Sequence, residues 1–151
     1  MKTDDQILAE IDLAFGDCGK PDHFTDFKHC EECADHDELL RSRDRSSLKI
    51  GDIGNPGWDP ILFCLPEGIA YFMPALTRIA LEKPTEELGW YGSLLLLHLS
   101  PQDWPSPFYQ YCTPVQRKAV AALLNYFMQS RSSSDDFDAR EVEKAIGRWK
   151  D

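Results

Sequence analysis

Residues 58–82 read WDPILFCLPEGIAYFMPALTRIALE, and this apolar segment separates two possible architectures. The apolar residues from Pro66 onward follow helical spacing, which predicts one long helix kinked at Pro74. The alternative is a short β-hairpin over 61–73, because apolar residues also alternate on both sides of the turn at Pro66 and Gly68. In that case Pro74 would open a helix. We expect the long helix, although Gly68 and Pro74 argue against it.

Helix start signals flank this segment on both sides. Thr3 and Gln6 form a capping box that opens a helix ending near Gly16, and Thr113 and Gln116 form a second box before a long apolar stripe. The last helix is predicted to start at Asp138. The apolar faces of these three helices comprise Ile7, Leu8, Ile11, Ala14 and Phe15; Val115, Ala119, Ala122, Leu123, Tyr126 and Phe127; and Val142, Ala145, Ile146 and Trp149.

The remaining segments fit around these helices. We expect a short helix over 30–43, and interpret the arginines at its far end, Arg41, Arg43 and Arg45, as a solvated helix end. Residues 50–60 are rich in turn formers and predict a loop, and the apolar run within 86–99 predicts the buried centre of the domain. Residues 100–114 predict a rigid, proline-rich loop. The whole chain is therefore expected to be mainly α, a single globular domain over 1–151 with five or six helices and at most one hairpin.

The charge of the chain limits its partners. Asp and Glu total 26 against 16 Lys and Arg, which gives a formal net charge of −10. A strongly acidic protein is repelled by nucleic acid and by anionic lipid surfaces, so we expect neither as a partner and allow for a protein partner. Half of the acidic residues, 13 of 26, lie at or before Asp44, so cations are drawn to that part of the chain. The sequence leaves the oligomeric state open.

The expected location is the cytoplasm. The first residues, MKTDDQILAE, lack a basic region followed by a long apolar run, and the densest apolar run is too short to cross a bilayer. The five cysteines include one C-x-x-C pair, which in a reducing compartment is more often a metal or redox site than part of a disulfide framework.

The segment 23–40, HFTDFKHCEECADHDELL, holds three of the four histidines and the C-x-x-C pair. A tetrahedral zinc ion needs four ligands at about 2.0 to 2.3 Å, and a C-x-x-C turn delivers two thiolates to one point. We therefore predict a zinc site made by Cys30, Cys33, His36 and His23, with His29 as the substitute for His23. Nearby carboxylates would orient the histidines.

Other interpretations of this segment stay open. The polar residues could simply gather at a helix start, or Cys30 and Cys33 could form a redox dithiol at a helix N-terminus. The negative charges of Glu31 and Glu32 oppose a thiolate, so the redox interpretation ranks below the metal. A site with three protein ligands would leave room for a water molecule and hydrolytic chemistry, with Glu31 or Glu32 as general base.

Two further features are interpreted as structural. His98 lies in an apolar run, which is typical of a buried histidine bonded to a neighbouring carbonyl group rather than of a catalytic base. The aromatic residues of two proline-rich loops, Trp58, Trp104, Tyr109 and Tyr111, are expected to cover the core. If they are exposed, they mark a partner surface.

Four stretches carry a family resemblance, namely HFTDFKHCEECADHDELL, GNPGWDPILF, PEGIAYFMPALTRIALE and TPVQRKAVAALLNYF. In this order, over about residues 7 to 127, the chain is similar to a family of small uncharacterised bacterial proteins with an HC-x-x-C segment and a Tyr-Phe-x-Pro-Ala segment. The resemblance implies a bacterial, cytoplasmic protein and transfers no catalytic role to any residue.

The combined expectation is a zinc-stabilised interaction module. The alternative is an enzyme, either a metal-dependent hydrolase or a thiol oxidoreductase that uses the pair Cys30 and Cys33.

Overall fold

The computed structural model describes residues 1–134 and 137–150. Within these ranges the chain is mainly helical, with eight α-helices, one 3-10 helix and no strand. The prediction of a mainly α protein is confirmed, and the predicted number of five or six helices is too low. The elements are α1 Asp4–Phe15, α2 Glu31–Arg41, α3 Ile50–Ile53, η1 Pro60–Phe63, α4 Pro66–Leu81, α5 Gly92–Leu99, α6 Pro107–Tyr111, α7 Pro114–Ser130 and α8 Ala139–Lys150.

Three short elements account for the difference in number. α3 lies in the segment 50–60 that was predicted as a loop, and α6 lies in the predicted proline-rich loop 100–114. α5 is only eight residues long. Short helices of this kind are stabilised by packing rather than by propensity, so periodicity over a long window misses them.

The helix α4 resolves the ambiguity of the central segment. It runs from Pro66, at its first position, through Pro74 to Leu81, and the alternative hairpin over 61–73 does not form. Residues 60–63 form η1 instead, where the carboxylate of Asp59 accepts a hydrogen bond from the Ile61 N–H at 3.0 Å. Proline at the first position of a helix is favourable because its missing N–H would have no partner there. The two prolines at 60 and 66 therefore start helical turns rather than frame a hairpin.

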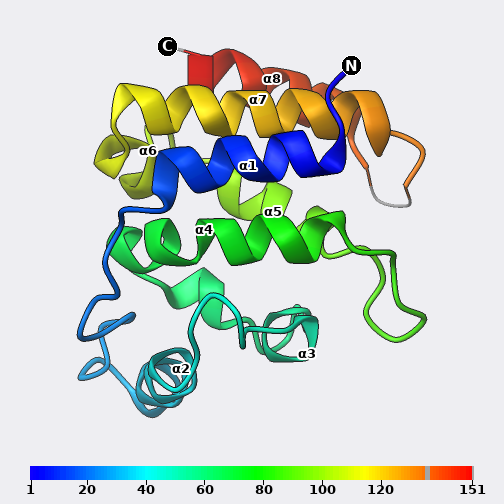
Figure 1. Cartoon of the computed structure of the whole chain (residues 1–151). Coiled ribbons are helices and arrows are strands. Elements are labelled where there is room, and N and C mark those ends of the chain that lie inside the picture. Colours follow the sequence, from blue (N-terminus) through cyan, green and yellow to red (C-terminus); the bar gives the residue numbers. More distant parts are fainter. Residues whose placement is uncertain (135–136, 151) are drawn as a thin grey trace.

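The core of the molecule surrounds α4, which is buried on nearly every side. Figure 1 shows α8, α7, α1 and α4 as successive layers, with α2 and α3 beyond the opposite side of α4. α1 packs against both α4 and α7, and α7 packs against α8. A helix that is apolar all round needs such cover on every side.

The predicted helix starts at Thr3 and Thr113 are confirmed, since both capping boxes are present. At the start of α8 the Asp138 carboxylate accepts hydrogen bonds from the N–H groups of Arg140 and Glu141. One member of the predicted apolar face of α7 is misplaced, because Val115 lies in its first turn and is exposed.

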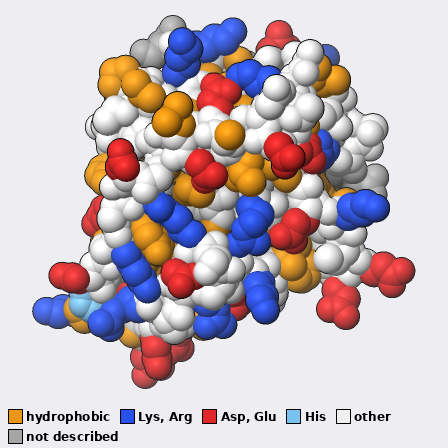
Figure 2. Space-filling model, viewed as in Figure 1, with side chains coloured by type: hydrophobic (Ala, Val, Ile, Leu, Met, Phe, Trp, Pro, Cys, Tyr) orange, Lys and Arg blue, Asp and Glu red, His pale blue; other side chains and the backbone are white. Residues whose placement is uncertain are grey.

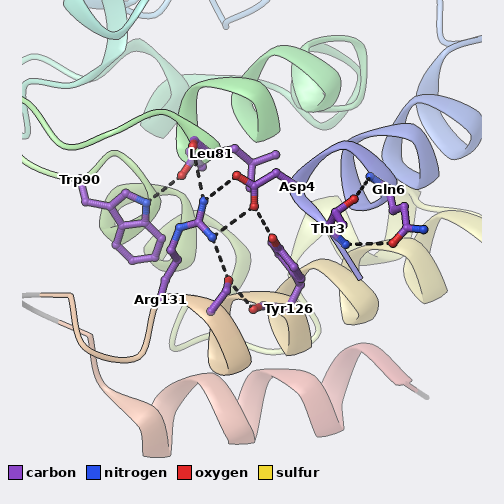
Figure 3. A network of polar contacts seen from close by, with 9 residues as sticks. Thr3, Asp4, Gln6, Leu81, Trp90, Tyr126 and Arg131 are labelled. Carbon is purple, nitrogen blue, oxygen red and sulfur yellow. Dashed lines mark hydrogen bonds and ion pairs between the residues drawn. The ribbon is translucent and has the colours of Figure 1, made fainter. Parts of the chain in front are cut away.

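A polar network joins the start of α1 to the ends of α4 and α7. The Asp4 carboxylate on α1 accepts hydrogen bonds from the Tyr126 hydroxyl on α7 and from Arg131 just after α7, the latter at 3.1 Å (Figure 3). Arg131 also reaches the Leu81 carbonyl at the end of α4. Trp90 donates from its indole N–H to the Ala80 carbonyl at 2.7 Å. The ends of α1, α4 and α7 are thereby held together.

The surface shown in Figure 2 carries acidic and basic side chains interspersed with small apolar areas. None of the helices in the described ranges has the length and apolar character that a membrane span requires.

Candidate metal centre

The two cysteines of the C-x-x-C pair meet at the start of α2. Cys30 is the N-cap residue, with an extended backbone, and its Sγ accepts a hydrogen bond from the Cys33 N–H at 3.4 Å. An N-cap side chain normally turns back to the third residue of its helix, and here that residue is the second cysteine. The sulfur atoms of Cys30 and Cys33 consequently lie 3.3 Å apart.

His29 completes a group of three ligands. Its Nδ1 lies 3.7 Å from the Cys33 Sγ, and the ligand atoms of His29, Cys30 and Cys33 all lie within 4.8 Å of one another. Two sulfurs bound to one tetrahedral zinc ion stand about 3.8 Å apart, as follows from zinc–sulfur bonds of about 2.3 Å. The three side chains are therefore positioned to hold a metal ion with only small adjustments. His29 and Cys30 are exposed and Cys33 is buried.

The loop before α2 is held in place by hydrogen bonds to this helix. The Asp37 carboxylate accepts from the N–H groups of Phe24 and Thr25, at 2.6 and 3.2 Å, and the Thr25 hydroxyl donates to the Cys33 carbonyl at 2.6 Å. Phe24 is fully buried in the core. These contacts fix the path of the chain that delivers His29 to the two sulfurs.

The other two predicted ligands lie outside this group. His36 is fully buried on α2, where its ring lies against Trp58 and Phe63 and its Nε2 is 3.1 Å from the Glu32 carboxylate. His23 is 2.7 Å from the Asp37 carboxylate through its Nδ1 and stacks on another ring of the loop. The structure thus joins the predicted cysteines with His29, the predicted substitute.

Two of the predicted orienting carboxylates do hold histidines, since Glu32 contacts His36 and Asp37 contacts His23. The signal that distinguishes His29 is its place directly before Cys30, on the same turn of chain. Sequence spacing favoured His36, one helical turn after Cys33. That direction leads into the core, because Trp58 and Phe63 pack over this face of α2.

The two thiols differ in acidity. The pKa of Cys30 is lowered, first by the hydrogen bond from the Cys33 N–H and then by His29. The pKa of Cys33 is raised, first by its hydrogen bond with the Cys30 sulfur and then by desolvation. The interaction with the Cys30 sulfur raises the pKa of His29. Cys30 is therefore the more acidic of the two thiols, and a bound metal cation would displace the thiol protons.

Negative charge surrounds the group. Asp26 and Glu32 contribute to the raised pKa of Cys33, and Asp26 also acts on His29. A divalent cation at this point would relieve that repulsion.

A cavity of about 650 Å³ lies elsewhere, between α7 and α8. Its walls offer amines, a guanidinium, an amide and apolar groups but no thiol, imidazole or carboxylate. None of the cysteines therefore lines this cavity.

Of the aromatic residues in the two proline-rich loops, some cover the core and others face solvent. Trp104 and Tyr109 pack on Trp149 of α8, as expected of a cover for the core. Trp58 and Tyr111 are 43% and 48% exposed. Trp58 packs against His36 of α2.

Comparison with known proteins identifies no relative: no family model matches the chain, and no similar protein was found among curated proteins or solved structures. The resemblance to a bacterial family stays a prediction.

Proposed function

We propose that the chain is a zinc-binding interaction module whose metal is held by His29, Cys30 and Cys33. The observation that carries the proposal is the convergence of one imidazole and two sulfurs within 4.8 Å at the start of α2. Two thiolates and an imidazole form a ligand set that zinc prefers over magnesium or calcium. His29 replaces His23 and His36 of the sequence-based prediction.

The exposure of the site supports an interaction role. Three protein ligands leave one position of a tetrahedron, and the exposed positions of His29 and Cys30 put that position on the surface. A water molecule or a donor group from a partner would fill it. Trp58 and Phe63, both exposed in part, pack against His36, one helical turn after Cys33, and offer apolar surface on the same helix.

The metal would also tie the loop 17–29 to α2. This loop has no regular secondary structure, and its described contacts to α2 run mainly through Asp37 and Thr25. A structural metal ion adds binding free energy to the folded state only, so zinc would raise the stability of this region.

A second candidate function is that of a thiol oxidoreductase, favoured by the opposite pKa shifts of the two thiols. The exposed Cys30 sulfur, as a thiolate, would attack a substrate disulfide, form a mixed disulfide with one substrate sulfur and release the other as a thiolate. The Cys33 thiol would then lose its proton and displace the second substrate thiol, leaving a Cys30–Cys33 disulfide and a reduced dithiol.

The test is the metal content of protein purified without a histidine tag, measured by elemental mass spectrometry. We expect about one zinc per chain, lost in Cys30→Ser and in His29→Gln, together with a lower thermal midpoint. Cys18→Ser is the matched control, because Cys18 lies outside the ligand group and should leave the zinc content unchanged.

Absence of zinc from the parent protein, even after dialysis against zinc under reducing conditions, would contradict the proposal. If glutathione disulfide instead oxidises this protein to a Cys30–Cys33 disulfide, and a dithiol then reduces that disulfide, the oxidoreductase function replaces the zinc-binding function. Zinc that persists in both variants would mean that other residues hold the metal.

A further inference from the structure

His98 forms a buried pair with an acidic residue far away in the sequence. Its Nε2 lies 2.9 Å from the Oδ2 of Asp59, and the two side chains are only 8% and 5% exposed. The sequence suggested a neighbouring carbonyl group as the partner of His98. The structure pairs it instead with the carboxylate that precedes η1.

The pair leaves one ring nitrogen of His98 available. Because a carboxylate accepts hydrogen bonds, Nε2 donates to Asp59, and in the neutral ring Nδ1 is then an acceptor. No described residue bonds to Nδ1, and this atom is not among the buried polar atoms without a partner. Nδ1 therefore has no hydrogen-bond partner among the described residues and is free to accept a hydrogen bond. The other carboxylate oxygen of Asp59 is bound by the Ile61 N–H, which fixes the orientation of the pair.

The imidazole of His98 lines a cavity of about 230 Å³ between η1, α4, α5 and α6. The walls are mostly apolar, and the other groups on them are the Ser106 hydroxyl and the Cys64 thiol. Lining residues include Ile61, Ile69, Leu97, Pro101, Pro107 and Phe108. Burial raises the pKa of Cys64 far above the ordinary thiol value, so this sulfur stays a neutral, weakly polar group.

The rim of the cavity is apolar although it faces solvent. Leu62 and Leu97, each 66% exposed, line the cavity and are among the few large apolar side chains that the described surface presents so openly. Apolar groups around a recess with one or two oriented polar groups are typical of a small-molecule site. The volume lies below the roughly 300 Å³ at which drug-sized pockets begin, which points to a small occupant.

We propose that this cavity binds a small hydroxyl-bearing molecule with an apolar body, whose hydroxyl group donates a hydrogen bond to Nδ1 of His98. The Ser106 hydroxyl is a second polar group on the wall. It accepts from the Tyr109 N–H at 3.1 Å, so its own proton remains free to donate. The apolar walls would contact the body of the ligand, and Asp59 would hold the imidazole in the accepting tautomer.

The test uses the whole chain and two probes, para-cresol and toluene, which share a ring and a methyl group and differ in the hydroxyl. Binding is followed by changes in backbone amide NMR signals. We expect para-cresol to shift signals of residues that line the cavity and to bind more tightly than toluene. His98→Phe should weaken para-cresol binding by roughly three- to tenfold, the value of one hydrogen bond, and leave toluene binding unchanged.

A second variant tests the cavity independently of His98→Phe, because that substitution leaves the buried Asp59 carboxylate without its histidine partner. Leu97→Lys changes the exposed rim and should weaken both probes, while Leu13→Lys, at an even more exposed leucine of α1, should affect neither. Equal affinity of the parent protein for both probes, signal changes away from the cavity, or a hydroxyl preference that survives in a folded His98→Phe protein would overturn the proposal.

Discussion

Asp37 is the residue that orders the approach to the candidate metal centre. Its buried carboxylate accepts hydrogen bonds from Phe24, Thr25 and His23. Burial alone would raise the pKa of Asp37, but the hydrogen bonds from His23 and the two backbone N–H groups outweigh it and lower the pKa below its ordinary value of 3.8. A single side chain therefore ties the loop before α2 to the helix that carries Cys33.

Asp37→Asn is expected to destabilise the protein by roughly 1.5 to 3 kcal/mol near neutral pH, because an ionised acceptor of several hydrogen bonds is lost. The contribution of Asp37 is present above its unfolded pKa and is lost as the pH falls through its lower folded pKa. Urea unfolding from about pH 7 to about pH 3 should show a shallower acid dependence for the variant than for the parent.

Asp35→Asn is the control for this prediction, since Asp35 is exposed on the same helix. Its stability should follow that of the parent protein at every pH. An Asp37→Asn protein with the same acid dependence as the parent would show that Asp37 does not control the loop.

At the scale of the elements, the first turn of α4 packs closely against its neighbours at Gly68. A Cβ atom there would lie 2.5 Å from the Cys64 Sγ and 2.8 Å from the Phe24 ring. Gly68→Ala is expected to destabilise the protein by about 1 to 3 kcal/mol despite the better helix propensity of alanine. Chemical denaturation of both proteins measures this difference.

Gly147 in α8 is the matched control, because a Cβ there meets no atom within 4 Å. Gly147→Ala should stabilise the protein by about 0.5 to 1 kcal/mol. If Gly68→Ala destabilises the protein and Gly147→Ala stabilises it, close packing rather than backbone freedom is the requirement at Gly68. Stabilisation by Gly68→Ala would contradict the observed contacts.

Arg45 joins two elements that are distant in the sequence. Its guanidinium donates to the carbonyl groups of Phe15, Gly16 and Cys18 at and after the end of α1, and to that of Tyr71 in α4, at distances from 2.6 to 3.0 Å. The sequence suggested a solvated helix end for this arginine. The N–H groups of its guanidinium instead donate to carbonyl groups at the end of α1 that have no hydrogen-bond partner within that helix.

Arg45→Lys should therefore cost about 2 kcal/mol of unfolding free energy although the charge is kept, because one ammonium group cannot reach all four carbonyls. Thermal and urea unfolding provide the measurement. Arg41→Lys is the control, since the Arg41 side chain is exposed and makes no hydrogen bond to the described residues. Equal stability of the two variants would argue against the bridging role of Arg45.

At the scale of the whole molecule, α8 closes the core through Trp149. The buried indole packs against Trp104, Phe108 and Tyr109, with ring centres 5.2 to 5.7 Å away, and donates to the Leu99 carbonyl at 2.7 Å. The last helix and the segment 100–114 therefore belong to one packed cluster.

Trp149→Ala is expected to destabilise the protein by about 3 to 5 kcal/mol, because it removes a buried ring and leaves a cavity. Near-ultraviolet and far-ultraviolet circular dichroism should lose their signals in one common transition at a lower temperature. Arg140→Ala, at an exposed position of the same helix, should behave like the parent protein. A stable core after the loss of Trp149 would show that α8 is only peripherally attached.

Local sequence signals were sufficient for α1, α7 and the start of α8, because a capping box and an apolar stripe involve residues only a few positions apart. The same reasoning favoured the long helix α4 and located the C-x-x-C pair, whose sulfurs meet through a single turn. Local signals did not reveal α3 and α6, which depend on the packing around them.

The partners of the histidines depend on tertiary packing. His36 follows Cys33 by one helical turn, yet it is buried under Trp58 and Phe63, and His29 takes the place beside the sulfurs. His98 and Asp59 are 39 residues apart and meet only because η1 and α5 pack at the same side of α4. Spacing in a sequence determines which side chains share a turn of helix, whereas long-range packing determines which groups share a site.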